Sequence, residues 1–171
     1  TERKSTCLRV DTEGGTPLGM VNWFGVHGTS VHGDNVLLHP DNKGMAAAAF
    51  ERTQPPGFVA LFAQEACGDV TPNHRFDRKR GCTVGPSDND FENAEAIGRL
   101  QLQYAHRAWT TAARREPLQA ELTSQISYHR LVDEGLVIMG MPMAAGTKEG
   151  RGPLRPFAGP ISWLSRLKGR R

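Results

Sequence analysis

Two apolar stretches of this sequence each end in side chains that hydrolytic sites use. Residues 18–26 lead directly to His27 and a Gly-Thr-Ser turn, and residues 58–63 lead to a polar loop that contains Thr71. A neutral imidazole at the end of a rigid strand is a good zinc ligand. A hydroxyl can attack a substrate or orient it by hydrogen bonding. The pattern is therefore compatible with a hydrolytic site that contains His27 and Thr71.

The same residues also have structural interpretations. A histidine in this position more often holds a loop by hydrogen bonds than it binds a metal, and Thr71-Pro72-Asn73 has the composition of a turn. His32 and His39 continue the series after His27 at intervals of five and seven residues, which fits no standard metal motif. We expect these two histidines to stabilise loops or lie at the surface. Residue types alone leave both interpretations of His27 and Thr71 open.

The predicted elements explain how these side chains would be positioned. Residues 6–10 and 17–26 are predicted to form a hairpin, because a Gly/Pro-rich turn separates two strand-like runs. The second run is almost continuously apolar, which indicates a central strand covered on both faces. A short Ala-rich helix is predicted over residues 43–52, with Asp41 and Asn42 capping its first N–H groups.

The rest of the pattern continues the alternation of strands and helices. Residues 58–63 predict a buried strand, a long polar loop follows to about residue 88, and residues 90–114 predict a helix with a Glu95–Arg99 pair. Four residues recur on one face of that helix: Ile97, Leu100, Tyr104 and Ala108. Further strands are predicted over residues 118–131 and 136–141. This order predicts an α/β layered domain with a mixed β-sheet and flanking helices.

Composition narrows the class of protein. Of the 171 residues, 38% are hydrophobic and 23% charged, as in globular proteins, and no apolar run approaches the roughly 20 residues of a membrane helix. The net charge is +3, and solvated loops explain the basic clusters at residues 75–80 and 166–171 more simply than nucleic-acid binding does. Contact with an anionic membrane surface stays open. Three cysteines without a C-x-x-C motif leave the compartment undecided.

Three segments carry a resemblance to a known family. They read Asn-Trp-Phe-Gly-Val-His-Gly-Thr-Ser over residues 22–30, Asp-Asn-Lys-Gly over residues 41–44 and Gly-Asp-Val-Thr-Pro-Asn over residues 68–73. In this order they resemble the neutral/alkaline non-lysosomal ceramidase family. The similarity extends over roughly residues 6–152, and it includes an Ala-Ala-Gly-Thr segment at residues 144–147.

The resemblance implies an activity and a set of site residues. It implies zinc-dependent hydrolysis of the N-acyl bond of ceramide or a related lipid amide, which gives a fatty acid and a sphingoid base. It implies that His27 is a zinc ligand and that Thr71 stands where the family has a serine implicated in activity. Threonine keeps the hydroxyl, but its methyl group restricts χ1 and makes nucleophilic attack less favourable. Substrate contacts are implied for five residues: Gly68, Asp69, Asn73, Gly146 and Thr147.

The family's remaining ligand motifs have no match in this sequence. An upstream His-x-His motif and downstream glutamate and tyrosine ligands are missing before residue 20 and after residue 152. We therefore expect residues 1–152 to be a partial ceramidase-like catalytic domain, secreted or periplasmic as in the family, and residues 153–171 to be a Pro/Gly-rich basic tail. The alternative is a non-catalytic α/β remnant without a complete metal site. A third possibility is a hydrolase of the same architecture that acts on another amide or ester.

Overall fold

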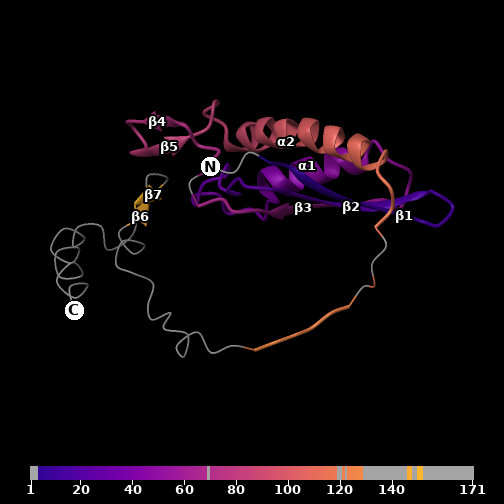
Figure 1. Cartoon of the computed structure of the whole chain (residues 1–171). Coiled ribbons are helices and arrows are strands. Elements are labelled where there is room, and N and C mark those ends of the chain that lie inside the picture. The colour runs from indigo at the N-terminus through magenta and orange to yellow at the C-terminus, as the bar shows by residue number, and fades with distance from the viewer. Residues whose placement is uncertain are drawn as a thin grey trace. The chain divides into compact units, whose positions relative to one another are not determined.

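The computed structural model of this protein contains two compact units, each described here by itself. The first consists of Thr1–Phe76 and Val84–Glu116 and holds the main sheet and both helices (Figure 1). The second consists of Asp77–Thr83 and Pro117–Arg171. The structure describes the following residues: 4–68, 70–118, 121, 123–128, 146–147 and 150–151.

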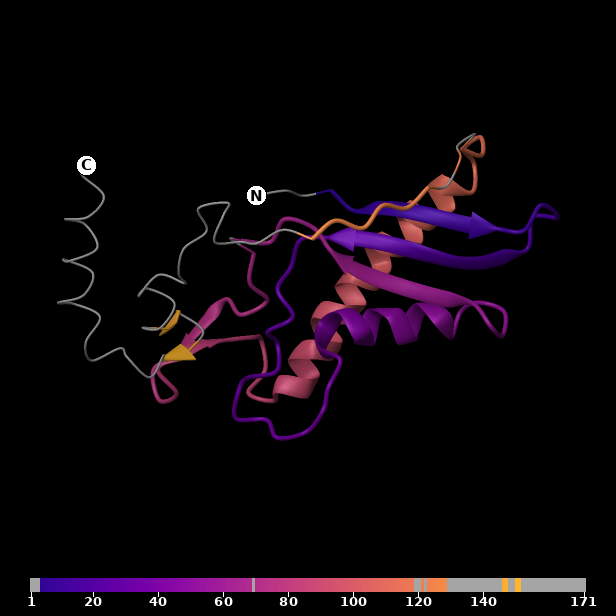
Figure 2. The ribbon, with the colours of Figure 1, turned by 90° about the horizontal axis from the view of Figure 1, so that it is seen from below.

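The base of the first unit is a three-stranded mixed sheet. β1 (Thr6–Asp11) pairs antiparallel with β2 (Pro17–Phe24), and β2 pairs in parallel with β3 (Val59–Gln64). Figure 2 shows the three strands side by side in the order β1, β2, β3. Gly15 allows the tight turn between the first two strands because it adopts φ = 80°. The predicted hairpin and the central position of its second strand are both confirmed.

Two helices cover one face of this sheet (Figure 1). α1 (Asp41–Glu51) connects β2 to β3, and α2 (Asp90–Ala112) follows later in the chain. The Asn89 side chain caps α2 by accepting hydrogen bonds from two backbone N–H groups of the first turn. The prediction of an α/β layered domain with a mixed sheet and flanking helices is confirmed. No helix among the described residues has the length and apolar character needed to cross a membrane.

Aromatic rings join the helices to the sheet. Phe50 of α1 is fully buried, and its ring centroid lies 5.8 Å from that of Phe58 and 5.8 Å from that of Trp109 on α2. Met20 and Ala60 of the sheet belong to the same buried cluster. Burying a side chain such as phenylalanine contributes roughly 1.5–3 kcal/mol, so this cluster is a main source of stability for the unit.

The buried face of α2 is shifted by one position from the predicted apolar face. Leu100 and Tyr104 are 52% and 53% exposed, although both belong to the predicted apolar face. The buried residues are mostly small or polar: Asn93, Ala94, Gly98, Gln101, Ala105 and Trp109. The reason is the close approach of α2 to α1 around Gly98, where even a Cβ atom would lie 2.9 Å from the Asn42 carbonyl oxygen. The predicted pair between Glu95 and Arg99 is confirmed.

The outer face of the sheet corrects another prediction. The apolar character of β2 predicted cover on both faces, but both described helices lie on the same side of the sheet (Figure 1). Four residues of the neighbouring strands are between 40% and 54% exposed: Leu8, Val10, Val59 and Leu61. The strand register places them beside Gly19 and Val21 of β2. The described residues therefore cover only one face.

Several smaller elements also differ from the predictions. The long polar loop contains two paired short strands, β4 (Arg75–Asp77) and β5 (Cys82–Val84). Residues 123–128, within a predicted strand, are not in a strand. Beyond them, β6 (Gly146–Thr147) pairs antiparallel with β7 (Gly150–Arg151). The other predicted strand, residues 136–141, and the tail at residues 153–171 lie outside the described residues.

Replacing Gly98 by alanine is expected to destabilise the first unit by about 1–3 kcal/mol, the usual cost of overpacking. A Cβ atom at Gly98 would lie 2.9 Å from the Asn42 carbonyl oxygen and 3.0 Å from the Met45 Cβ atom, so the two helices would have to separate. Urea unfolding followed by circular dichroism measures the change. Gly33→Ala is the control, because a Cβ atom there meets no atom within 4 Å. Equal stability of the two variants would contradict the close helix packing.

Candidate functional site

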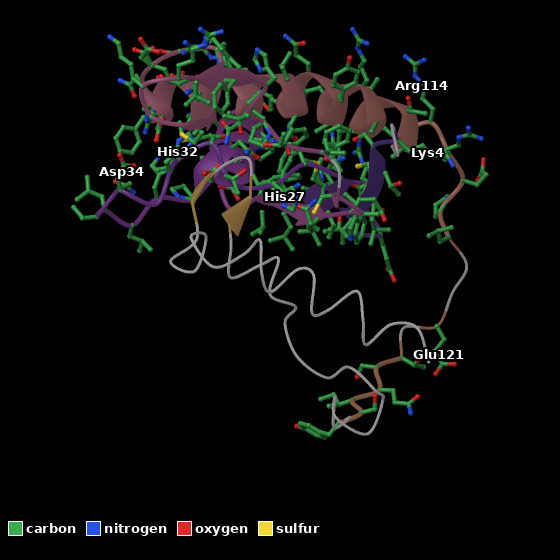
Figure 3. The ribbon with its side chains drawn as sticks, turned by 90° about the vertical axis from the view of Figure 1, so that its left-hand side faces the viewer. Lys4, His27, His32, Asp34, Arg114 and Glu121 are labelled. Atoms are coloured by element: carbon green, nitrogen blue, oxygen red, sulfur yellow. The ribbon has the colours of Figure 1, made fainter. Side chains whose placement is uncertain are left out.

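The two loops that carry His27 and Thr71 meet at one edge of the sheet. β2 and β3 are parallel, so the first loop (residues 25–40) and the second loop (residues 65–74) both begin at the carboxyl ends of strands. In α/β sheets this edge is where ligands usually bind. The His27 backbone N–H donates to the Val70 carbonyl at 3.0 Å. Figure 3 looks onto this edge of the sheet, with His27 labelled.

The position of His27 is fixed by its backbone and by its ring. Its carbonyl oxygen accepts a hydrogen bond from the Asn42 Nδ2 atom at 3.0 Å, and its ring Nδ1 atom lies 3.7 Å from the Cys67 Sγ atom. The first loop can pass this close to the second because Gly25 has no side chain: a Cβ atom there would lie 2.3 Å from the Ala66 carbonyl oxygen. His27 is therefore a partly buried imidazole in a defined orientation, as a metal ligand requires.

Asn42 connects the first loop to both helices. Its side chain is 0% exposed. Its Nδ2 atom donates to the His27 carbonyl and to the Ser30 Oγ atom, and its Oδ1 atom accepts from the Gln101 Nε2 atom at 2.9 Å. One amide thus makes three hydrogen bonds to a loop and to a second helix. Buried amides satisfied in this way specify a unique arrangement of the elements they join.

The predicted helix-capping role of Asp41 and Asn42 is confirmed only in part. The N-cap position is Pro40, which has no capping side chain, but the Asp41 carboxylate accepts the backbone N–H of Asn42 in the first turn at 2.6 Å. The same carboxylate also accepts hydrogen bonds from the backbone N–H groups of Ser30 at 3.2 Å and Val31 at 2.9 Å. These N–H groups follow His27 in the first loop and have no strand partner, so the carboxylate satisfies them. Both residues therefore support the loop that carries His27.

Lys43 holds the two parallel strands together at the same edge. Its ammonium group donates to the Phe24 carbonyl at 2.9 Å and to the Ala63 carbonyl at 3.0 Å. Burial lowers the pKa of Lys43, and the nearby Cys67 thiol partly opposes this by raising it. The Phe24 carbonyl also accepts the Glu65 backbone N–H at 3.3 Å, and the cation adds a second donor that links it to the Ala63 carbonyl. The strand ends from which both loops begin are therefore held together.

Thr71 and Asn73 form a turn in the second loop. The Thr71 Oγ1 atom accepts from the Asn73 backbone N–H at 3.1 Å, so the structural interpretation of Thr71-Pro72-Asn73 as a turn is confirmed. The Asn73 side chain is buried and donates to the Thr29 carbonyl at 2.6 Å, which ties the turn to the first loop. Thr71 itself is exposed, so its side chain is accessible to a ligand.

The other predicted site residues are only partly placed. Gly68 lies in a tight turn in which the Val70 N–H donates to the Cys67 carbonyl at 2.9 Å. Asp69 lies outside the described residues. Gly146 and Thr147 form β6, which belongs to the second unit, whereas His27 belongs to the first.

His32 and His39 have the structural roles that their spacing predicted. The His32 ring Nδ1 atom lies 2.8 Å from an Asp90 carboxylate oxygen, which also accepts the His32 backbone N–H. The His39 ring accepts the Asp41 backbone N–H at 3.0 Å and packs against Phe91, with the centroids 5.1 Å apart. The first of these contacts attaches the first loop to the start of α2. Both histidines therefore stabilise loops.

The described part of the chain does not fit a complete zinc centre. A catalytic zinc ion usually has three protein ligands. Within the described ranges, no three His, Cys, Asp or Glu side chains are grouped so that they could hold a metal ion. His27 and Cys67 together offer two donor atoms, and Cys67 is a free thiol. We therefore derive no reaction step through a metal from these residues.

The supporting roles of Asn42, Gln101 and Lys43 were not predicted from the sequence, although it contains a signal for the first two. Asn42 precedes Ala46 and Phe50 at helical spacing, and all three are buried on α1. Gln101 interrupts the stripe of small residues on α2 in the same way. A polar residue at a position that should be apolar indicates a buried hydrogen-bond network. Lys43 gives no comparable signal, because a lysine in the first turn of a helix is ordinary.

This chain is similar to known proteins of one family. Residues 1–159 match the family model described as neutral/alkaline non-lysosomal ceramidase, N-terminal. The neutral ceramidase of Pseudomonas aeruginosa is 36% identical over 88% of this chain and 24% of its own length. The neutral ceramidase of Mycobacterium tuberculosis is 32% identical over 86% of this chain and 26% of its own length. The chain thus spans about a quarter of the length of these relatives.

Solved structures agree with the sequence comparison. The crystal structure of neutral ceramidase from Pseudomonas aeruginosa matches with a TM-score of 0.52 and 36% identity over 62% of this chain and 16% of that one. A solved structure of ceramidase complexed with C2 matches with a TM-score of 0.54 and 37% identity over 62% of this chain and 16% of that one. This chain therefore belongs to the neutral/alkaline non-lysosomal ceramidase family.

Proposed function

We propose that this chain takes part in the zinc-dependent hydrolysis of the N-acyl bond of ceramide or a related lipid amide. Water adds across the amide, and the products are a fatty acid and a sphingoid base. The observation that carries the proposal is the meeting of the two loops at the edge of the parallel strands, where the His27 N–H donates to the Val70 carbonyl. Family membership supports the same reaction, because the relatives are named neutral ceramidases.

The proposal assigns different tasks to the two loops. His27 supplies one metal ligand, and Asn42 and Asp41 hold the loop that carries it. Thr71 orients the substrate or the attacking water by hydrogen bonding, because its side chain is exposed and directly follows Val70, which bonds to His27. The described residues contain no third metal donor at this place, so the remaining zinc ligands come from other parts of the protein. Gly68, Asp69, Asn73, Gly146 and Thr147 remain proposed substrate contacts.

A second candidate function is a non-catalytic domain that retains the fold. Two observations favour it: the metal donors among the described residues are incomplete, and Thr71 occupies the place of the family's serine. Such a domain would keep the hydrogen bonds around Asn42, because these bonds stabilise the fold without regard to chemistry.

Release of fatty acid from a ceramide with a fluorescent acyl chain distinguishes the two functions. The complete natural protein is assayed with zinc and after removal of the metal by a chelator. Turnover that disappears with the chelator and returns with zinc is the expected result. Turnover that the chelator leaves unchanged would refute the zinc dependence, and a folded protein without turnover under either condition would support the non-catalytic domain.

Replacing Thr71 by alanine is expected to lower turnover by about 10- to 100-fold, the loss typical of a misplaced reactant. Thr71→Ser keeps the hydroxyl and removes the methyl group that restricts its rotation, so this variant should keep turnover at the natural level or above. The measurement is kcat and KM for both variants. An alanine variant as active as the serine variant would show that the Thr71 hydroxyl only stabilises its turn.

A further inference from the structure

A thiol and an imidazole face each other where the two loops meet. The Cys67 Sγ atom lies 3.7 Å from the His27 Nδ1 atom. Both side chains are partly buried, and Cys67 is a free thiol. The next residue, Gly68, is exposed, and a Cβ atom there would meet no atom within 4 Å, so solvent reaches this part of the loop. Thiolate and imidazole are both ligands of copper and zinc ions in proteins.

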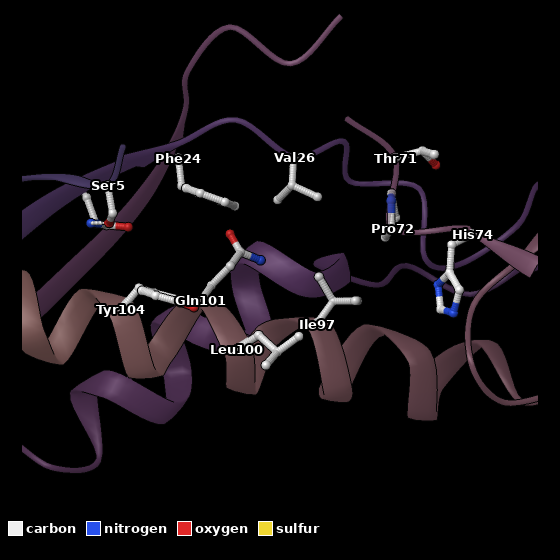
Figure 4. A pocket seen from close by; sticks show the side chains of 11 residues that line it. Ser5, Phe24, Val26, Thr71, Pro72, His74, Ile97, Leu100, Gln101 and Tyr104 are labelled. Carbon is white, nitrogen blue, oxygen red and sulfur yellow. Dashed lines mark hydrogen bonds between the residues drawn. The ribbon is translucent and has the colours of Figure 1, made fainter. Parts of the chain in front are cut away.

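The direction of the side chains at the end of β2 turns His27 toward the second loop. Figure 4 shows Phe24 and Val26 pointing toward α2, where they line a pocket. Gly25 faces the second loop instead, since a Cβ atom there would lie 2.3 Å from a backbone carbonyl oxygen of that loop. The His27 ring contacts Cys67 of the same loop. His27 therefore continues the alternation of sides that is typical of a strand.

Backbone hydrogen bonds hold both donor residues in place. The His27 N–H donates to the Val70 carbonyl at 3.0 Å, and the Val70 N–H donates to the Cys67 carbonyl at 2.9 Å. Val70 thus joins the two residues through its own carbonyl and amide. The Asn42 side chain holds the His27 carbonyl from α1. Because the two donors are already positioned, little rearrangement is needed to bind one ion, and such preorganisation raises affinity.

The separation of the two donors matches that of two ligands on one metal ion. Typical bonds, with zinc as the reference, are about 2.3 Å to sulfur and about 2.0–2.1 Å to nitrogen. At tetrahedral to trigonal angles, these bond lengths place the two ligand atoms about 3.5–3.8 Å apart. The 3.7 Å between Cys67 Sγ and His27 Nδ1 falls within this range. A metal ion can therefore replace the thiol proton without a change in the backbone.

The number of donors and the local charge favour a soft monovalent ion. Within the part of the chain that the structure describes, no third His, Cys, Asp or Glu side chain joins this pair. Zinc usually takes at least three protein ligands, whereas thiolates select soft ions such as Cu(I). The Lys43 ammonium lies close enough to Cys67 for a Coulombic interaction. A thiolate and a monovalent cation form a neutral unit beside it, whereas a divalent cation would leave a repulsive positive charge there.

We propose that Cys67 Sγ and His27 Nδ1 bind a soft monovalent metal ion of the Cu(I) class. On binding, the Cys67 thiol releases its proton to solvent, and the sulfur and the ring nitrogen each donate an electron pair to the metal. Neither the metal nor the sulfur changes its oxidation state. This site goes beyond the proposed function and does not rest on it, because the other ring nitrogen, His27 Nε2, stays available for zinc.

Competition with a chelator measures the affinity of the 171-residue chain for Cu(I) in the absence of zinc and ceramide. Without oxygen, one equivalent of Cu(I) divides between the chain and the coloured chelator bicinchoninate, whose absorbance reports the copper that it holds. His27→Ala and Cys67→Ser should each weaken binding by about 100-fold or more, the usual gain from linking two binding groups. Equal affinity of the natural chain and the His27→Ala variant would overturn the proposal, whatever the outcome for ceramide hydrolysis.

Cys7→Ser is the matched control, because this free thiol lies on β1 opposite Asn22 rather than beside His27. The control should keep the natural affinity, and a loss equal to that of Cys67→Ser would contradict the assigned site.

X-ray absorption at the copper edge tests the same site without a variant. The natural chain with one equivalent of Cu(I) should show coordination by sulfur and by an imidazole nitrogen. Coordination by sulfur alone would mean that thiols bind the ion without His27, and it would overturn the proposal. Poor folding of a variant therefore does not remove the test.

Discussion

Replacing His27 by alanine should abolish zinc-dependent turnover in the complete natural protein. Partners in the outer shell of a metal typically contribute about 10- to 100-fold to affinity or activity, and we expect the loss of a direct ligand to exceed this range. The backbone contacts of His27 to Val70 and Asn42 do not involve its ring, so the loop should keep its position in the variant. Function and folding are therefore separable at this residue.

The measurement combines turnover with zinc content per chain, determined by elemental mass spectrometry after loosely bound metal is removed. His39→Ala is the control, because this histidine of the first loop contacts the Asp41 backbone of α1 and the Phe91 ring of α2 rather than a proposed ligand. The control should keep its zinc and most of its turnover. A His27→Ala variant that retains both would rule out His27 as a ligand.

Replacing Asn42 by alanine should destabilise the first unit by about 3–5 kcal/mol. The substitution leaves the His27 carbonyl, the Ser30 hydroxyl and the Gln101 amide without a partner in a region that excludes water. Each buried group left unsatisfied costs about 1–3 kcal/mol, and partial relaxation reduces the sum. This loss would be a large fraction of the 5–15 kcal/mol that stabilises a typical domain.

Urea unfolding monitored by tryptophan fluorescence measures this effect, because Trp109 lies in the core that both helices share. The matched control is Asn35→Ala, which removes only exposed hydrogen bonds to Leu37 and should change the stability by less than about 0.5 kcal/mol. A loss below 1 kcal/mol for Asn42→Ala would mean that water or a rearranged side chain replaces its hydrogen bonds.

Local sequence patterns predict much of this structure. A Gly-rich turn between apolar runs predicted the β1–β2 hairpin, and helical periodicity predicted α2 and its Glu95–Arg99 pair. The apolar run before His27 and the run before the second loop predicted two strands whose following loops could share a site. These features depend on neighbours within a few residues, so the sequence contains the information directly.

Long-range contacts decided the rest. Gln101 bonds to Asn42 across 59 positions, and Asn73 reaches the Thr29 carbonyl across 44. No local pattern gives such pairings, so the capping pattern at Asp41 and Asn42 does not predict that both residues also hold the first loop. The same limit applies to the faces of the sheet, because an apolar strand does not indicate which elements cover it. The sequence by itself determined which residues, such as His27 and Thr71, have side chains suited to a hydrolytic site. Only the tertiary structure decided which buried amides fix the loops that carry them. The reason is that a buried polar group needs a hydrogen-bond partner, and the folded chain can supply that partner from any position in the sequence.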